Sequence, residues 1–366
     1  MAKKVVLTGG GTAGHIYPAL ALAEKLQADG CEVWFAGTPN GIEARIVPEA
    51  NIPFAGFESS GFNRRHPMTL PKGIARIMKS TRKAERWFDE IKPDAVVAFG
   101  GYVSIPVARA AEHQGIPVVV HEQNSVMGMA NKYIAKKAKA VCLTYEEAAK
   151  YVPEGIPWTI TGNPVRGSVI KATREEGREY LGIPADGTLL VVFGGSKGAR
   201  HINEAVAAMK DELLAIDGLY VIHITGEAEL DATKELLQLA DDEAQRYRVM
   251  GYQSRMAETL AAADAVVSRA GATSLAEISA KAIPAILVPY PYATNDHQRI
   301  NARALADAQA ALVIDDAEID SEAFRDAVLK LAADADARAR MKKAMLSLQP
   351  EDAAAKLDEV VESCLE

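Results

Sequence analysis

The hydrophobic pattern of the chain alternates short, strongly apolar runs with longer segments in which apolar residues recur every three or four positions. The short runs are rich in valine, leucine, isoleucine and phenylalanine, and they are nearly continuous, as in strands covered on both faces. The longer segments have the period of amphipathic helices. This alternation is typical of an α/β protein with parallel sheets.

In the first half the pattern predicts strands at residues 4–8, 32–36, 95–99, 118–121 and 140–143, with helices that include residues 16–28 and 74–90. In the second half it predicts strands at residues 189–193, 220–225, 265–268 and 285–288, with helices that include residues 199–214, 230–240, 272–281 and 297–307. Each half opens with an apolar strand that runs into a glycine cluster and then a helix. We therefore expect two Rossmann-like, nucleotide-binding-type domains.

Length and composition agree with two soluble domains. The chain has 366 residues, against roughly 150 per domain, and prolines and glycines gather between residues 153 and 166. No apolar run approaches the roughly 20 residues of a membrane span, and no signal peptide is recognisable, so we expect a cytoplasmic protein. Cys31, Cys142 and Cys364 are too widely spaced for a metal site or a disulfide framework.

Positive charge is concentrated in one segment of an acidic chain. The net charge is −8, yet residues 61–92 carry nine Lys and Arg against three Asp and Glu. Apolar residues stand beside these charges, namely Met68, Leu70, Ile74, Ile77 and Met78. The combination suits contact with an anionic membrane surface, although an ordinary helix with a solvated basic face would look similar. Nucleic acid is not an expected partner, because the whole chain is acidic and no aromatic platform accompanies the charges.

The first glycine cluster, Gly9-Gly-Gly-Thr-Ala-Gly14, formally matches the G-x-G-x-x-G loop between a strand and a helix. Such a loop lets a phosphate or sugar approach backbone N–H groups at a helix N-terminus. A dinucleotide site also needs a carboxylate after the second strand, and that strand ends Phe35-Ala-Gly-Thr-Pro39 without one. We therefore disfavour a dinucleotide site; a tight turn without a ligand is the plainer alternative.

His15 immediately follows this loop at the start of a helix. The helix dipole there disfavours the protonated imidazole, so a neutral His15 could accept a proton from a substrate. The alternative is a histidine that only caps or packs the turn.

Polar or glycine-rich sequence also follows the other predicted strands, whose carboxyl ends face one crevice in a parallel sheet. These segments are Gly100-Gly-Tyr-Val-Ser104, His121-Glu-Gln-Asn124, Gly194-Gly-Ser-Lys-Gly-Ala-Arg200, Arg269-Ala-Gly-Ala-Thr-Ser-Leu-Ala-Glu277 and Asn295-Asp-His-Gln298. Glu277 could accept hydrogen bonds from ribose, or could simply be a favourable charge near a helix start. Asp334-Ala-Asp336 lies in the helical tail far from any glycine loop, so we interpret it as surface charge and expect no metal.

These segments, in this order, resemble the MurG family of UDP-N-acetylglucosamine–N-acetylmuramyl-(pentapeptide) pyrophosphoryl-undecaprenol N-acetylglucosamine transferases. The resemblance covers residues 4 to about 302 and includes Thr161-Gly-Asn-Pro-Val-Arg166. It implies a GT-B architecture whose domains face a central cleft, with residues 1–162 and the helix at about 345–366 in one domain and residues 163–344 in the other. It implies inverting transfer of GlcNAc from UDP-GlcNAc to the C4 hydroxyl of MurNAc in lipid I at the cytoplasmic face of the membrane, without a cofactor.

The resemblance also implies the site residues. His15 is the expected base, and Thr12, Ala13, Gly14 and Asn124 are expected near the GlcNAc. The expected ligands of UDP and the sugar are Arg166, Ser196, Gly271, Ala272, Thr273, Ser274, Leu275, Ala276, Glu277 and Gln298. The family's loop has glycine where this chain has Ala13, which is harmless if that position needs no positive φ.

Two other functions fit the same segments. A UDP-GlcNAc 2-epimerase with the GT-B fold would act on UDP-GlcNAc without an acceptor. A regulator that binds the nucleotide sugar would bind it without turnover.

Overall fold

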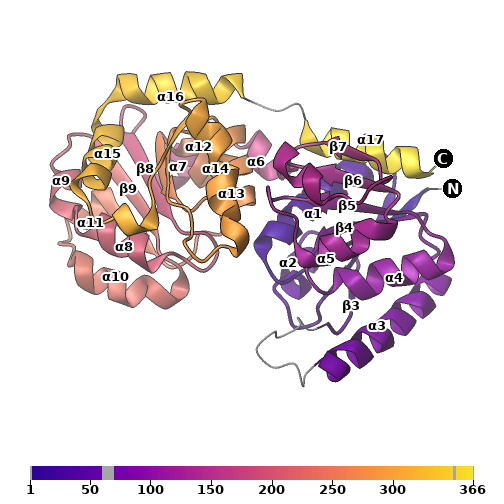
Figure 1. Cartoon of the computed structure of the whole chain (residues 1–366). Helices are drawn as coiled ribbons and strands as arrows, with labels where there is room; N and C mark the ends of the chain where they lie inside the picture. The colour runs from indigo at the N-terminus through magenta and orange to yellow at the C-terminus, as the bar shows by residue number, and fades with distance from the viewer. Residues whose placement is uncertain (1, 60–69, 349–351, 366) are drawn as a thin grey trace. The chain divides into compact units, whose positions relative to one another are not determined.

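The computed structural model describes residues 2–59, 70–348 and 352–365. The chain forms two compact units: unit 1 is Met1–Arg166 with Pro350–Glu366, and unit 2 is Gly167–Gln349. Figure 1 shows a sheet within each unit with helices on both of its faces. The predicted α/β class with two parallel sheets is confirmed.

Unit 1 is built on a seven-stranded sheet in the order β3-β2-β1-β4-β5-β6-β7, and every pair of neighbours is parallel. Its strands are β1 (Lys4–Gly9), β2 (Glu32–Gly37), β3 (Phe54–Gly56), β4 (Ala95–Gly100), β5 (Val118–Glu122), β6 (Ala140–Leu143) and β7 (Trp158–Ile160). Its helices are α1 (Ala13–Ala28), α2 (Glu43–Glu49), α3 (Leu70–Ile91), α4 (Ser104–Gln114), α5 (Met129–Ile134) and α17 (Ala353–Leu365).

Alternate residues of these strands feed two cores, one on each face of the sheet. Val6 and Val96 pack with α3, α4 and α5, whereas Val5 and Val97 pack with α1 and α17. Because both faces are covered, the strands are apolar throughout, as the sequence pattern predicts.

The end of the chain returns to unit 1, where α17 lies against α1 (Figure 1). Leu357 and Val361 are fully buried in the core beneath α1. At the edge of this contact, Lys25 on α1 lies 3.4 Å from a carboxylate oxygen of Asp358. Sequence distant by more than 300 residues thereby completes one face of the unit 1 sheet.

Unit 2 has a six-stranded parallel sheet in the order β10-β9-β8-β11-β12-β13. The strands are β8 (Thr188–Phe193), β9 (Leu219–Ile224), β10 (Tyr247–Met250), β11 (Ala265–Ser268), β12 (Ala285–Leu287) and β13 (Ala311–Val313). The helices are α6 (Gly167–Lys171), α7 (Arg174–Leu181), α8 (Arg200–Ala207), α9 (Lys210–Leu214), α10 (Leu230–Leu237), α11 (Glu243–Arg246), α12 (Met256–Ala262), α13 (Ala272–Ala280), α14 (His297–Asp307), α15 (Glu322–Ala333) and α16 (Ala335–Ser347).

Both sheets reverse their strand order at one point. In unit 1 the reversal lies between β1 and β4, and in unit 2 it lies between β8 and β11. Open α/β sheets bind ligands outside the carboxyl ends of the strands at such switch points. The glycine clusters after β1, β4, β8 and β11 all stand at these ends, so the fold itself marks two places for the candidate site.

The structure departs from the predicted elements where local sequence carries little signal. The helix predicted over residues 199–214 is broken into α8 and α9, because Met209 leaves the helical backbone and is buried in the core. The helix predicted over residues 230–240 ends at Leu237, where Gln238 takes a left-handed conformation. Four strands of three or four residues were not predicted, namely β3, β7, β10 and β13. One of them, β7, lies inside residues 153–166, where prolines and glycines gather.

In the basic segment, residues 60–69, which include Arg64, Arg65 and Met68, lie outside the described residues, as do the side chains of Leu70 and Lys72. The prediction that Ile77 supplies apolar surface is wrong. Ile77 is buried, because it shares a helix face with Ala84 and Phe88, and all three pack in the unit 1 core. Ile74 and Met78 are exposed on α3.

A buried histidine makes the stability of unit 2 sensitive to acid. His223 is fully buried; its Nε2–H donates to Oδ1 of Asn203 at 3.1 Å, and its Nδ1 accepts from the Tyr247 hydroxyl at 2.9 Å. Burial lowers the pKa of His223 from 6.5 to about 3. Its stabilising contribution is therefore complete above pH 6.5 and is lost as the pH falls from 6.5 towards 3, because only the unfolded chain binds the proton there.

We expect unit 2 to lose about 2 kcal/mol more stability between pH 7 and pH 5 in the natural chain than in a His223→Gln variant. Hydrogen exchange of β8 and β9 amides at the two pH values measures this, and the comparison cancels the other titrating groups. Equal pH dependence of the two proteins would contradict the assignment.

Candidate active site

The glycine loop of unit 1 is held by a neighbouring glycine loop. The N–H of Gly10 donates to the carbonyl of Gly100 at 3.2 Å. A Cβ added to Gly101 would lie 2.5 Å from the Gly10 oxygen, so only glycine fits at that position. The loops after β1 and β4 are therefore packed backbone against backbone at the switch point of the sheet.

His15 is the third residue of α1 and is half-buried beside this contact. Its Nδ1 lies 2.9 Å from the carbonyl oxygen of Gly10. A carbonyl oxygen can only accept, so Nδ1 carries the proton of the neutral ring and Nε2 carries the lone pair. A Cβ at Gly100 would come within 3.1 Å of Nε2, so that glycine makes room for the imidazole. The arrangement leaves Nε2 as the atom that can take up a proton.

The start of α1 leaves its backbone N–H groups without a side-chain cap. Thr12 is the N-cap residue, yet its hydroxyl makes no capping bond; it is exposed and lies 3.4 Å from Nδ1 of His15. Ala13 begins the helix and does not have a positive φ, so its methyl group costs no backbone strain. Thr12, Ala13 and Gly14 thus lie at a helix N-terminus that has no side-chain cap, where a polar ligand is favoured.

Asn124 is positioned by a buried carboxylate that sequence reasoning had not singled out. Glu122, at the end of β5, accepts from the Asn124 backbone N–H at 3.1 Å and from its side-chain amide at 3.3 Å. The other carboxylate oxygen accepts from the Gly128 N–H and from Asn131 Nδ2, both at 2.9 Å. Four donors on one carboxylate fix the conformation of residues 122–131, including the predicted sugar-binding amide.

His121 holds parts of unit 1 together through two buried hydrogen bonds of its ring. It is fully buried, donates from Nε2 to the Gly162 carbonyl at 2.9 Å and accepts at Nδ1 from Gln123 at 3.0 Å. Burial lowers its pKa from 6.5 to about 4, so it stays neutral near pH 7. This bond ties β5 to the Thr161–Arg166 motif.

Arg166 is the last residue of unit 1. Its guanidinium carbon lies 3.9 Å from the centre of the Tyr17 ring on α1, within the range of a cation–π contact. A cation predicted to hold UDP is therefore placed beside the helix that carries His15.

The first loop of unit 2 presents Ser196 and Lys197 to solvent ahead of α8, which has no side-chain cap. The backbone of Thr225 packs closely against this loop: a Cβ on Gly198 would lie 1.8 Å from the carbonyl oxygen of Thr225. Gly195 has φ +88 with nothing near a Cβ, so its glycine serves the backbone turn. The loop is closely packed at Gly198 and presents exposed polar side chains at Ser196 and Lys197.

The second loop of unit 2 leads into α13, whose N-cap is Gly271. Gly271 has a negative φ, and an added Cβ would approach only Ser274, at 4.0 Å. Neither backbone strain nor packing within the chain requires glycine here, which is expected where a ligand approaches the helix N-terminus closely. Ala272, Leu275 and Glu277 are buried, whereas Thr273, Ser274 and Ala276 are half-buried.

Gln298 is oriented by the neighbouring loop. Its side-chain oxygen accepts from the Tyr290 N–H at 2.9 Å, which directs its amide donors away from that bond. Arg269 is 9% exposed, pairs with Asp316 at 2.5 Å and donates to the Val288 and Pro289 carbonyls. The loop after β12 is thereby anchored to the end of β11.

The predicted site residues therefore fall into two groups at the carboxyl ends of strands. In unit 1 these are Thr12, Ala13, Gly14, His15, Asn124 and Arg166; in unit 2 they are Ser196, the residues from Gly271 to Glu277, and Gln298. Sequence reasoning missed Glu122 and also Glu43, which lies below the first glycine loop. Glu43 lies only four residues beyond Pro39, so a carboxylate does follow β2, slightly later than a dinucleotide site would place it.

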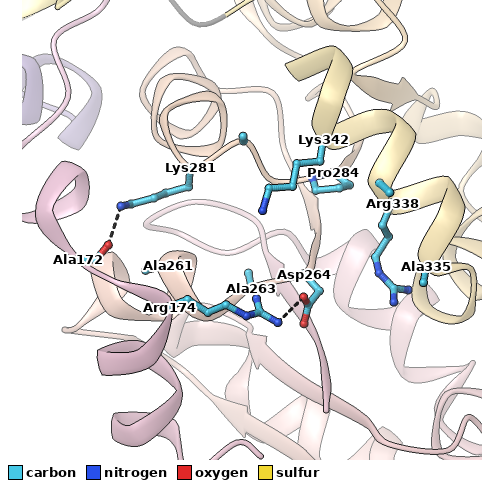
Figure 2. A pocket seen from close by; sticks show the side chains of 12 residues that line it. Ala172, Arg174, Ala261, Ala263, Asp264, Lys281, Pro284, Ala335, Arg338 and Lys342 are labelled. Atoms are coloured by element: carbon cyan, nitrogen blue, oxygen red, sulfur yellow. Dashed lines mark hydrogen bonds and ion pairs between the residues drawn. The ribbon is translucent and has the colours of Figure 1, made fainter. Parts of the chain in front are cut away.

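Unit 2 also has a hollow of about 420 Å³ at the amino ends of its strands, away from the glycine loops. It lies next to residues that directly precede β11 and β12 (Figure 2). Three of its four basic side chains bind backbone carbonyls at helix ends, and one of the three, Arg174, donates to the Ala262 carbonyl at 3.2 Å. Lys281 donates to the Ile170 and Ala172 carbonyls, and Arg338 donates to the Leu331 and Ala332 carbonyls. These cations serve as C-terminal caps, so we assign the hollow to the packing of unit 2.

Two family models match the chain. The glycosyltransferase family 28 N-terminal domain matches residues 5–143, and the glycosyltransferase family 28 C-terminal domain matches residues 189–357. Among solved structures, MurG from Acinetobacter baumannii is 30% identical with a TM-score of 0.71, and 99% of each chain is covered. The kitacinnamycin glycosyltransferase has a TM-score of 0.72 at 16% identity, a likeness of fold alone.

Curated relatives match over nearly the whole chain. A protein of Halothermothrix orenii is 43% identical over 86% of both chains, and one of Bacillus subtilis is 38% identical over 98% of this chain and 99% of its own. Both are named UDP-N-acetylglucosamine–N-acetylmuramyl-(pentapeptide) pyrophosphoryl-undecaprenol N-acetylglucosamine transferase. With matching models in both units and relatives of this identity and coverage, the chain belongs to the MurG family of glycosyltransferases.

Proposed function

We propose that the protein transfers GlcNAc from UDP-GlcNAc to the C4 hydroxyl of MurNAc in lipid I, forming lipid II for peptidoglycan synthesis. The observation that carries this is full-length similarity to relatives with that named activity, 36% to 43% identical. Membership of the family favours this function over a 2-epimerase or a regulator.

The proposal assigns donor binding to unit 2. The N-termini of α8 and α13, which have no side-chain cap, direct N–H groups to the diphosphate, and Ser196 and Thr273 add hydroxyl groups. Glu277 accepts from ribose, and Gln298 directs its amide to the nucleotide sugar. Fixed dipoles that face the developing UDP anion stabilise the leaving group in the transition state.

The proposal assigns acceptor activation to unit 1. Nε2 of His15 takes the proton from the C4 hydroxyl as its oxygen attacks the anomeric carbon from the face opposite UDP, which inverts that carbon. The imidazolium that results keeps its Nδ1–H bond to the Gly10 carbonyl. Asn124, held by Glu122, orients the donor sugar for this attack.

An assay with radiolabelled UDP-GlcNAc and a lipid I analogue tests the proposal. We expect acceptor-dependent transfer with a β-1,4 linkage and release of one UDP for each sugar transferred. Formation of UDP-ManNAc without an acceptor would identify an epimerase. Binding of UDP-GlcNAc with neither reaction would identify a regulator.

We also propose that the protein works at the cytoplasmic face of the membrane, on an anionic surface contacted by α3. Among the described residues, no helix is long and apolar enough to cross a bilayer. Ile74 and Met78 are each 46% exposed, one helical turn apart, and Arg82 and Arg86 continue along the exposed side of the helix. Exposed apolar side chains beside cations suit interfacial binding.

A double variant, Ile74→Ser with Met78→Ser, should bind vesicles of phosphatidylglycerol at least about tenfold more weakly, because two apolar side chains no longer enter the interface. Sedimentation with vesicles measures this, and binding should also weaken with salt. Ile170→Ser is the matched control, since Ile170 is exposed on unit 2. Equal binding by all three proteins would rule out α3 as the contact.

A further inference from the structure

Glu43 is a buried acid to which the proposed reaction assigns no role. It begins α2 and is 0% exposed. One carboxylate oxygen accepts from the Thr38 N–H at 2.9 Å, and the other accepts from the Gly11 N–H at 3.4 Å. No lysine or arginine among the described residues forms an ion pair with it. Burying a carboxylate without a cation beside it costs free energy, which its hydrogen bonds offset only in part.

Three glycines enclose the Glu43 side chain. A Cβ on Gly10 or Gly41 would lie 2.4 Å from its carboxylate, and a Cβ on Gly37 would lie 2.7 Å from its Cγ. None of the three has a positive φ, so backbone conformation does not require glycine at these positions. The space that the carboxylate occupies accounts for them. Glycines from the first loop, from the end of β2 and from the segment just before α2 therefore form a socket for one acid.

This carboxylate and His15 bind opposite ends of a single peptide group. The C=O of Gly10 and the N–H of Gly11 belong to the same peptide unit. The oxygen of that unit accepts from Nδ1 of His15 at 2.9 Å, while its N–H donates to Glu43 at 3.4 Å. A negative charge at the N–H end polarises the peptide, so its oxygen becomes a better acceptor. The charge of Glu43 thus reaches the imidazole through one amide.

We propose that Glu43 is a positioning residue for His15 and acts through the Gly10–Gly11 peptide. It holds the loop in place and strengthens the bond that keeps the neutral imidazole protonated at Nδ1, with Nε2 free to accept. The same bond stabilises the imidazolium that forms when Nε2 takes up a proton. The catalytic consequence rests on the proposed role of His15 as the base, whereas the effect on the His15 tautomer does not.

The test combines nitrogen-15 NMR of the histidines with steady-state kinetics in Glu43→Gln. The natural chain should show neutral His15 protonated at Nδ1, with its signals identified by their loss in His15→Asn. In Glu43→Gln we expect a mixture of both tautomers, because an amide that presents N–H to Gly11 cannot accept from it. For kcat we expect a loss on the order of 10- to 100-fold with little change in KM for UDP-GlcNAc.

Glu49→Gln is the matched control, since Glu49 lies on the same helix, carries the same charge and is exposed. Gly41→Ala is the second variant, because its methyl group displaces the carboxylate without removing the charge, and it should reproduce the tautomer mixture. An unchanged His15 tautomer in both variants overturns the proposal. So does neutral His15 protonated at Nε2 in the natural chain, a measurement that needs no variant.

The role of His15 as the base and the influence of Glu43 on His15 can be tested separately. If His15 is not the base, the tautomer still changes in Glu43→Gln while kcat stays within a few-fold of the natural value. If His15 is the base and Glu43 has no influence on it, His15 variants lose activity while Glu43→Gln keeps both its tautomer and its kcat.

Discussion

Replacing His15 by alanine should lower kcat for transfer to lipid I by about 100- to 10,000-fold. The change removes the atom that takes up the acceptor proton, and no other described side chain occupies the same position between the loops after β1 and β4. The change also removes the Nδ1–H bond to the Gly10 carbonyl at 2.9 Å, but no helix cap is lost, because Thr12 and not His15 is the N-cap residue of α1.

Steady-state kinetics with a lipid I analogue measure this loss, and calorimetry with UDP-GlcNAc should show unchanged donor binding. His113→Ala is the matched control, because His113 is an exposed histidine of unit 1 that pairs with Glu85 at 2.7 Å. A decrease in kcat of less than about threefold for His15→Ala would remove His15 from the mechanism. Weaker donor binding with unchanged kcat would make it a binding residue instead.

The parallel α/β fold was predictable because each central strand is buried on both faces and is therefore apolar without interruption. Val96, Val97 and Ala98 are all completely buried, so their sequence has no polar side to confuse with a helix. Edge strands lack this signal. Trp158, Thr159 and Ile160 form β7 although all three are exposed, and a short exposed run beside prolines has the composition of a linker.

The candidate ligand-binding residues were proposed from glycine loops and strand ends, but the residues that hold them in place could not be proposed in this way. Asn124 stands in a polar run directly after a strand, which is a local pattern. Glu43 acts on a loop 32 residues away, and the socket that receives it consists of glycines whose reason for being glycine is visible only in three dimensions. Burial of Ile77 shows the same limit: apolar residues on a basic helix do not reveal from sequence alone which of them face the core.

The largest loss of stability should follow from Asp264→Ala in unit 2. Asp264, directly before β11, contacts two other elements: it pairs with Arg174 at 2.6 Å and Arg178 at 2.7 Å on α7, and it accepts from the Leu189 N–H at 2.8 Å at the start of β8. Figure 2 shows Arg174 reaching Asp264 at the floor of the unit 2 hollow. The Arg178 side chain is only 6% exposed, and burial lowers its pKa. Without Asp264, the buried Arg178 guanidinium loses its ion-pair partner at 2.7 Å.

We expect Asp264→Ala to destabilise unit 2 by about 3–5 kcal/mol, the usual cost when one partner of a buried ion pair is removed. Asp264→Asn should cost less, since an amide oxygen still accepts one hydrogen bond. All three tryptophans, Trp34, Trp87 and Trp158, lie in unit 1, so their fluorescence reports that unit alone. Hydrogen exchange of β8 amides should therefore accelerate while the tryptophan unfolding transition stays in place.

Asp241→Ala is the control for this experiment, because Asp241 is exposed in unit 2 and an exposed substitution changes stability by about 0.5 kcal/mol or less. If β8 amides exchange at the same rate in Asp264→Ala and Asp241→Ala, the two arginines find other partners. Asp264 would then not be required for the stability of unit 2. If the tryptophan transition moves as well, the two units do not unfold independently, and the loss measured in unit 2 belongs to the whole chain.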